Sequence, residues 1–238
     1  MWNWSTVLFL GAMLPRWETP VISLLVFRDE TMPDEEVNAL ELATRQAATD
    51  WSSECLTLKI NVTHDSSSDR TERDGASRVL LRRREWCRNG NTSDQCYNPA
   101  ALAMTTRYLS ETSLSTLVEA DIEINATNFD WFRLNGGRKP PVSLRIVLAH
   151  ELGHVFGLSH QNALGNTIMT DAAHNGQAAV TGVSVWDRMR LCELYNGQSV
   201  SKSTPLDKHP LTEDRVKLVV ASVFLVAAGL VVAILRRQ

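Results

Sequence analysis

Three of the six histidines in the 238-residue chain lie close together, in the stretch LAHELGHVFGLSH at residues 148–160. Imidazole nitrogen is a common metal ligand. His150 and His154 are four residues apart, which places both on the same face of an α-helix. Gly157 can end that helix in a positive-φ conformation and turn the chain back, so that His160 supplies a third nitrogen. Because three imidazoles leave one position of a tetrahedral zinc ion open for water, the spacing predicts a catalytic zinc site.

Glu151 follows the first of these histidines directly, and its side chain points about 100° away around the helix. Its carboxylate is therefore expected to lie beside the zinc ion without binding it. A carboxylate in this place can act as the general base for a zinc-activated water that attacks a peptide carbonyl. The sequence thus predicts a zinc-dependent endopeptidase with Glu151 as its catalytic residue. The alternative is a non-catalytic zinc-binding ectodomain for adhesion or recognition, which has no need of Glu151.

The complete pattern, H-E-x-x-H-x-x-G-x-x-H, resembles the zinc signature of the metzincin proteases. Met169 in NTIMTD, nine residues after His160, resembles their methionine turn. Two further stretches resemble the matrixin branch, which comprises the matrix-metalloproteinase-like members. EADIEINA at 119–126 resembles the edge strand that precedes the active-site helix, and VSVWDRMRLCELYNG at 183–197 resembles the closing helix. The resemblance covers residues 21–197.

This resemblance implies an endopeptidase that acts on protein or peptide substrates. It also implies the fold: an α+β domain with a metzincin-like twisted mixed sheet, an active-site helix and a closing helix. By the same resemblance, Met169 forms an apolar floor under the zinc without binding it. The edge strand at 119–126 is expected to pair with an extended substrate.

The chain departs from the matrixin pattern at several positions. Gln161 stands where matrixins commonly have serine, and Thr170-Asp171 replaces a Tyr-Pro pair. The loop rich in histidine and aspartate, which holds a second zinc in many members, has no counterpart. The remaining histidines are His64, His174 and His209. We therefore expect one zinc per chain, and the sequence does not indicate whether calcium binds.

Periodicity along the chain predicts the order strand, helix, three strands and two helices, which is an α+β arrangement. The segment 33–53 is amphipathic, with Pro33 at its first helical position and acidic residues in its first turn, which predicts a helix. The zinc-site helix is expected to begin near Ser143, and Ser184 and Asp187 form a capping box at the start of the last helix. Apolar or alternating stretches predict strands at 21–29, 56–62, 77–84 and 120–126, with another strand or an irregular piece at 101–109.

Two apolar segments lie near the ends of the chain. Leu218–Leu235 contains 18 residues without a charge, enough for a transmembrane helix. Arg236-Arg237 follow it, which favours a cytoplasmic C-terminus. The run Val7–Leu14 is typical of a signal peptide, with a first strand as the alternative. The expected protein is thus single-pass, with its catalytic domain on the extracytoplasmic side of the membrane. Its expected parts are a signal or N-terminal apolar segment at 1–19, the catalytic domain at 20–197, a polar stalk at 198–216 and the transmembrane helix with a short basic tail at 217–238.

The four cysteines are an even number, as expected of an exported protein with disulfides. Three pairings are possible. Cys87 and Cys96 flank a short loop that closes easily, so we favour their bond, which leaves Cys55 with Cys192. The alternative is an intracellular, tail-anchored protein whose cysteines are reduced.

The net charge of −3 and the hydrophobic content of 44% are those of an ordinary globular protein and indicate no charged partner. The arginine cluster is interpreted as a solvated strand and turn, because no aromatic interleaving or known nucleic-acid-binding module accompanies it. We therefore expect no nucleic acid among the partners, only substrates and the membrane. The cluster consists of Arg78, Arg82, Arg83, Arg84 and Arg88.

Overall fold

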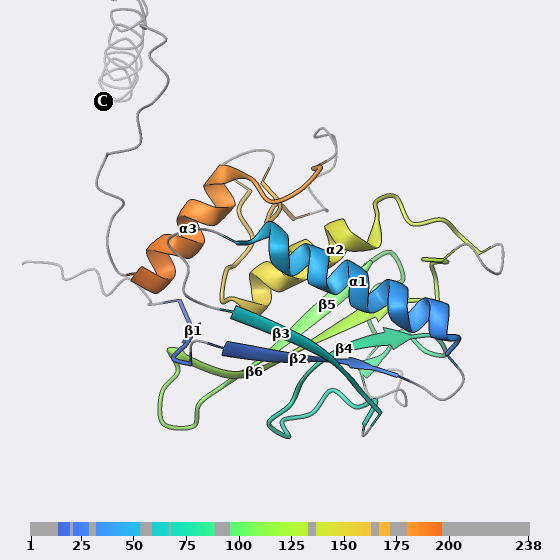
Figure 1. Ribbon diagram of the computed structural model, residues 1–238, viewed down its shortest axis with the longest axis horizontal. Coiled ribbons are helices and arrows are strands. Elements are labelled where there is room, and N and C mark those ends of the chain that lie inside the picture. Colours follow the sequence, from blue (N-terminus) through green and yellow to red (C-terminus); the bar gives the residue numbers. More distant parts are fainter. Residues whose placement is uncertain are drawn as a thin grey trace, which may run out of the picture. The chain divides into compact units, whose positions relative to one another are not determined.

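A mixed β-sheet with helices on one face forms the part of the chain that the computed structural model describes (Figure 1). Five strands run parallel in the order β1-β6-β4-β2-β3, and β5 pairs antiparallel with β6. The strands are β1 Arg16–Trp17, β2 Val21–Phe27, β3 Lys59–Asp65, β4 Ser77–Arg82, β5 Ala103–Leu109 and β6 Thr116–Asn125. The described residues are 14–19, 21–28, 32–52, 59–66, 68–88, 96–132, 137–162, 167–171 and 180–196.

The segment expected to be the edge strand is an inner strand. β6 pairs with β4 on one side, from Val79↔Ile122 onward, and with β5 on the other, from Ala103↔Ile124 onward. The prediction that residues 119–126 offer a free edge is therefore wrong. Its alternation of apolar and acidic residues imitates a strand with one solvated face, yet both faces of β6 are buried. The edge position belongs to β5, because no described strand pairs with its other side.

The helices begin within one residue of the expected positions, and α1 ends at Asp50, three residues before its expected end. α1 Asp34–Asp50 has Pro33 as its N-cap residue, and α2 Leu144–Val155 has Ser143, whose side chain accepts a hydrogen bond from the Ile146 amide. α3 Val185–Asn196 is the closing helix. Figure 1 shows α1 and α2 on the same face of the sheet.

Trp51 ties α1 to α2 at the centre of the core. Its indole N–H donates to the Ala149 carbonyl at 2.8 Å, and its ring meets the edge of Phe156 at a centroid distance of 5.6 Å. The Trp51 side chain is fully buried. This contact fixes the helix that carries the first two histidines against the rest of the core, because a buried aromatic ring packs in one orientation only.

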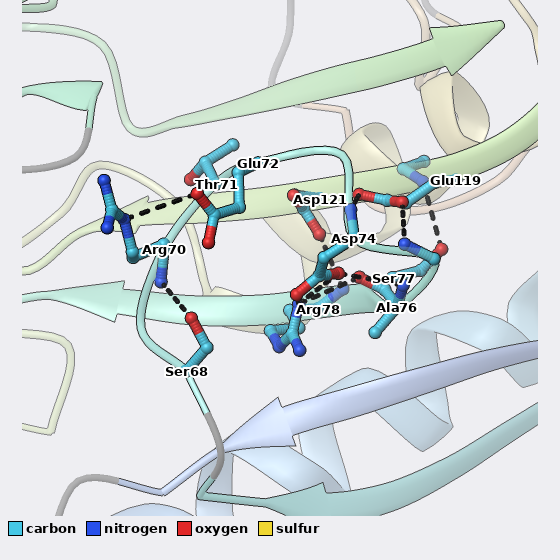
Figure 2. Close-up of polar contacts among 12 residues, drawn as sticks. Ser68, Arg70, Thr71, Glu72, Asp74, Ala76, Ser77, Arg78, Glu119 and Asp121 are labelled. Atoms are coloured by element: carbon cyan, nitrogen blue, oxygen red, sulfur yellow. Dashed lines mark hydrogen bonds and ion pairs between the residues drawn. The ribbon is translucent and has the colours of Figure 1, made fainter.

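The opposite face of the sheet carries a buried layer of acidic and basic side chains, part of which is drawn in Figure 2. Arg78 pairs with Asp74 at 2.8 Å, and Arg82 pairs with Glu123 at 2.7 Å. The Gly75 amide donates to the carboxylate of Glu119. The interpretation of the arginine cluster as solvated is thus wrong for Arg78 and Arg82, whose side chains are only 4% and 10% exposed. Charge alone does not reveal that acidic residues of β6 lie beneath them.

The N-terminal side of the domain reaches further than expected. Arg16 and Trp17 form β1 beside the start of β6. The Trp17 indole donates to the carbonyl of Val155, the last residue of α2, at 2.7 Å. Arg16 donates to the Leu194 carbonyl on α3 at 3.0 Å. Residues 14–19 therefore belong to the domain, while 1–13 lie outside the described residues.

The disulfide between Cys87 and Cys96 is confirmed. Cys192 is also disulfide-bonded, but its expected partner Cys55 lies outside the described residues. The expected stalk and transmembrane helix, at 198–238, lie outside them as well. Within the described ranges, no helix has the length and apolar character needed to cross a membrane.

Candidate active site

Three histidine side chains meet at the C-terminal end of α2. His150 and His154 lie one turn apart on the helix, and each Nε2 atom is 3.1 Å from the Nε2 atom of His160. The helix ends because Gly157 adopts a φ of 100°, with its amide donating to the His154 carbonyl. A Cβ atom at Gly157 would collide with the carbonyl oxygen of Pro15. Glycine is thus required both by the conformation and by the close approach of the N-terminal segment.

The rings are oriented by backbone carbonyls. His150 Nδ1 lies 2.6 Å from the Ile168 oxygen, and His154 Nδ1 lies 2.9 Å from the Leu158 oxygen. A carbonyl can only accept, so each Nδ1 carries the hydrogen and each Nε2 presents its lone pair to the centre of the site. Burial lowers the pKa of His154 to about 3, which keeps that imidazole neutral.

This donor set fits zinc. Lone pairs that converge at such short distances repel one another unless a cation lies between them. Neutral imidazoles oriented by a second hydrogen bond are the usual ligands of zinc in proteins. Among the described residues, this trio is the group whose geometry could hold a metal ion.

Glu151 lies beside the trio and points toward the edge strand. Its side chain is buried, and burial raises the pKa of its carboxyl group. Its Oε2 atom accepts a hydrogen bond of 2.5 Å from the hydroxyl group of Thr105 on β5. The same hydroxyl group lies 3.4 Å from the backbone carbonyl oxygen of Glu151, so the carboxylate faces β5.

Met169 is buried beneath the α2 segment that carries the histidines. Its Sδ atom lies so close to Gly153 that a Cβ atom there would collide with it, and the Met169 side chain is 1% exposed. The position agrees with the apolar floor expected from the methionine turn. The backbone carbonyl of Met169 also accepts a 2.7 Å hydrogen bond from the Gln161 amide.

Comparison with known families decides the identity of this site. The sequence model described as Matrixin, a peptidase family, matches residues 49–196, more than half of the chain. The chain belongs to the matrixin family. No curated protein matches it. The family and the geometry together make the protein a zinc metalloendopeptidase.

At the positions where this matrixin departs from the expected pattern, hydrogen bonds to backbone carbonyls join the segments. Gln161, in the place of the usual serine, joins the methionine turn through its main-chain amide, and its side chain donates to the His160 carbonyl at 2.9 Å. The Thr170 hydroxyl, in the place of the usual tyrosine, lies 3.3 Å from the carbonyl of Gln161. The two segments are thus held together without the usual side chains.

Asp187 connects the closing helix of this matrixin to the site. Its Oδ2 atom accepts from the Ile168 amide at 3.0 Å and from the Ser184 amide at 2.8 Å. Because the carbonyl of Ile168 orients His150, Asp187 supports a ring that faces the metal position. The capping box formed by Ser184 and Asp187 is confirmed, but its connection to the histidine site does not follow from sequence spacing.

Thr105 is the other residue of the site that sequence reasoning missed. It lies 46 positions before Glu151, in a segment interpreted as a strand or an irregular piece. No local motif links the two residues. Only the register of β5 against β6, with Thr105 opposite Ile122, places the hydroxyl group next to the carboxylate.

Proposed function

We propose that this matrixin is a membrane-anchored endopeptidase in which His150, His154 and His160 bind one zinc ion and Glu151 is the general base. The observation that carries the proposal is the convergence of three oriented Nε2 atoms beside a buried carboxylate. A structural zinc site would be closed by a fourth protein ligand. None of the described residues supplies one.

The residues of the chain divide the reaction between them. Bound zinc supplies Lewis acidity, which polarises the substrate carbonyl and makes water more acidic. Glu151 takes a proton from the attacking water as the new C–O bond forms. It then delivers that proton to the leaving amine as the C–N bond breaks, so the carboxylate is regenerated. Its burial suits both roles, because a carboxyl group with a raised pKa holds the proton between the two steps.

The substrate is expected to bind along β5 and not along β6. The outer edge of β5 has no strand partner among the described residues, and such an edge can hydrogen-bond to an extended peptide. Thr105 lies on this strand next to Glu151, so a peptide added to the edge passes the carboxylate. A substrate added as a strand is recognised through its backbone hydrogen bonds, which is consistent with an endopeptidase for protein substrates.

Membrane anchoring and an extracytoplasmic catalytic domain belong to the same proposal. They rest on the apolar run Leu218–Leu235 and on the basic residues that follow it. The disulfide between Cys87 and Cys96 is consistent with an oxidising compartment.

Replacing Glu151 with glutamine tests the catalytic assignment. The change keeps the size of the side chain and its ability to accept from Thr105, but it removes the base. We expect the variant to retain zinc and its melting temperature while the rate of peptide hydrolysis falls at least about a hundredfold. The measurements are metal content, thermal unfolding and cleavage of a quenched peptide library.

His154→Ala is the matched comparison, because it is expected to lose both zinc and activity. A Glu151→Gln variant that cleaves as fast as the wild type contradicts the proposed mechanism. Wild-type protein that binds zinc yet cleaves no peptide favours the alternative of a non-catalytic zinc-binding ectodomain.

A further inference from the structure

Arg107 lies on the same face of the edge strand as Thr105. Side chains alternate along a strand, so residues two apart point the same way. The hydroxyl group of Thr105 reaches Glu151, which shows that this face of β5 looks toward α2. Arg107 is also close enough to His154 for its positive charge to act on that imidazole. The guanidinium group therefore belongs to the side of β5 that faces the proposed zinc site, one strand repeat beyond Thr105.

The guanidinium group of Arg107 lacks a complete set of partners. Its Nη1 atom is buried and has no hydrogen-bond acceptor among the described residues. Other buried arginines of the domain do have carboxylate partners: Arg78 pairs with Asp74 and Arg82 with Glu123. Removing a charged donor from water without a compensating acceptor costs folding free energy. A buried arginine that lacks an acceptor near an active site indicates that a bound ligand supplies the missing hydrogen-bond acceptor.

A substrate on the edge of β5 can supply that ligand. Every second side chain of an added strand faces α2, as Thr105 and Arg107 do, and directly opposed side chains in neighbouring strands are in contact. The residue opposite Thr105 lies nearest to Glu151 and hence to the scissile bond. Antiparallel pairing is the more stable arrangement. In that arrangement, the substrate residue opposite Arg107 lies about two positions to the amino-terminal side of the substrate residue opposite Thr105.

We infer that Arg107 binds an acidic side chain of the substrate, so that the enzyme prefers aspartate or glutamate about two residues before the cleaved bond. A carboxylate is favoured over a neutral carbonyl because it satisfies the buried N–H group and also neutralises the guanidinium charge. This inference rests on the proposed function, since it assumes that the peptide lies along β5.

Paired peptides test the inference. Quenched peptides with blocked ends carry glutamate or glutamine at each of the positions flanking the cleaved bond. For the wild type we expect kcat/KM to be at least about tenfold higher with glutamate at one amino-side position. Arg107→Gln should abolish that preference by lowering kcat/KM for the glutamate peptide to the level of the glutamine peptide, and Arg107→Lys should retain part of it. Arg70→Gln is the matched control, because Arg70 pairs with Glu72 in an exposed position.

Two results overturn the inference. One is an equal loss of activity on both peptides in Arg107→Gln, which indicates a general role in the reaction. The other is a wild-type enzyme with no charge preference, or with one confined to the carboxyl side of the bond. Thermal unfolding adds a separate readout, because removal of an uncompensated buried charge should raise the melting temperature of Arg107→Gln. A lower melting temperature indicates a structural role and contradicts the inference.

A binding experiment separates this inference from the proposed function. Fluorescently labelled glutamate and glutamine peptides are titrated into Glu151→Gln protein and into the Glu151→Gln/Arg107→Gln double variant. We expect the glutamate peptide to bind at least about tenfold more tightly to the single variant and equally to the double variant. Equal binding to the single variant overturns the inference. This measurement is decisive even if the wild type hydrolyses nothing, an outcome that contradicts only the proposed function.

Discussion

A single hydroxyl group sets the direction of the proposed general base. The Glu151 carboxylate accepts a short hydrogen bond, 2.5 Å long, from the hydroxyl group of Thr105. Glu151 lies on α2, whereas Thr105 lies on β5. A carboxylate that transfers a proton twice has to be held within hydrogen-bonding reach of both the water and the leaving group. Thr105 is thus a positioning residue: its contribution acts through Glu151.

Replacing Thr105 with valine keeps the shape of the side chain and removes the hydroxyl group. We expect kcat to fall about tenfold, while KM and zinc content stay close to those of the wild type, because only the orientation of the base changes. Thr105→Ser should restore most of the activity, since it returns the donor. Steady-state kinetics and metal analysis of the two variants give the answer. A loss of kcat that serine does not restore contradicts the positioning role.

Gly153 is the residue at which the histidine helix touches the methionine turn. A methyl group there collides with Met169 and crowds the Trp51 ring. We expect Gly153→Ala to lower the free energy of unfolding by about 1–3 kcal/mol, the usual cost of overpacking a core. Gly182→Ala is the matched control, because open space surrounds that position. Urea unfolding measures the free energy of unfolding of both variants. If Gly153→Ala is as stable as Gly182→Ala, the packing of Met169 against the helix is contradicted.

Residues of the site could be predicted from the sequence where their geometry is local. His150, Glu151 and His154 belong to one helix, and Gly157 returns the chain to His160 within a single turn. Thr105 and Arg107 could not be predicted, because their place next to the site depends on which strand is at the edge and on its register.

At the scale of elements, the closing helix and the histidine helix are coupled through the methionine turn. The carboxylate of Asp187 accepts a hydrogen bond from the Ile168 amide. The carbonyl of Ile168 in turn accepts a hydrogen bond from His150. The two contacts lie on the consecutive peptide groups that flank Ile168, so a shift of this residue would misdirect the imidazole. Supporting hydrogen bonds of this kind commonly change metal affinity by about 10–100-fold.

Asp187→Ala therefore tests the coupling between the two helices. We expect the zinc affinity to fall by about 10–100-fold, with a smaller loss of thermal stability from the missing helix cap. Glu193→Ala on the exposed side of α3 is the matched control. Competition with a chromogenic chelator measures the affinity, and an unchanged value for Asp187→Ala contradicts the coupling.

The layer of acidic and basic side chains under the sheet gives the domain a pH-dependent stability. Asp121 is fully buried, accepts one hydrogen bond from the Arg78 amide, and lies near Glu119 and Asp74 (Figure 2). Burial, opposed in part by that hydrogen bond, raises its pKa to about 7. Between pH 4 and 7 the folded protein keeps a proton that the unfolded chain releases. Its contribution to stability is therefore complete in acid and is lost as the pH rises through about 7.

Asp121→Asn removes this proton linkage. The neutral amide keeps an acceptor for the Arg78 amide and never ionises. We expect the variant to gain stability relative to the wild type as the pH rises from 4 to 8, by about 2–4 kcal/mol. Asp69→Asn, at an exposed position, should show no such change. Chemical unfolding at a series of pH values checks this, and a constant difference between Asp121→Asn and the wild type contradicts it.

Helices were more predictable than strands for a physical reason. Their caps and apolar stripes are encoded within each segment, as at Pro33 and Ser143. A strand acquires its position only from partners elsewhere in the chain. The acidic residues of β6 therefore resembled a solvated face, although Arg78, Arg82 and the loop at 68–76 cover them.

At the scale of the whole molecule, the domain is closed by contacts between distant parts of the chain. Trp17 and Arg16 join β1 to the end of α2 and to α3, 138 and 178 positions away. Two of the four cysteines form the Cys87–Cys96 bond, and Cys192 is also bonded. Covalent links of this kind hold together parts of the chain that are distant in sequence or lie in loops.

The topology of the full chain is the remaining prediction, and it separates the exported protein from the intracellular, tail-anchored alternative. An exported domain meets an oxidising compartment, so its cysteines should stay paired, whereas cytosolic thiols are kept reduced. The full-length protein, expressed in its membrane and denatured in the presence of an alkylating reagent, should therefore show no free thiol.

Protease added to intact cells should remove the catalytic domain and leave a fragment that contains Leu218–Leu235, with the basic C-terminus protected. Permeabilised cells, in which the protease reaches both sides of the membrane, are the control for that protection. Four reactive thiols together with a domain that resists external protease contradict the extracytoplasmic placement, because both results require the domain to lie in the cytosol.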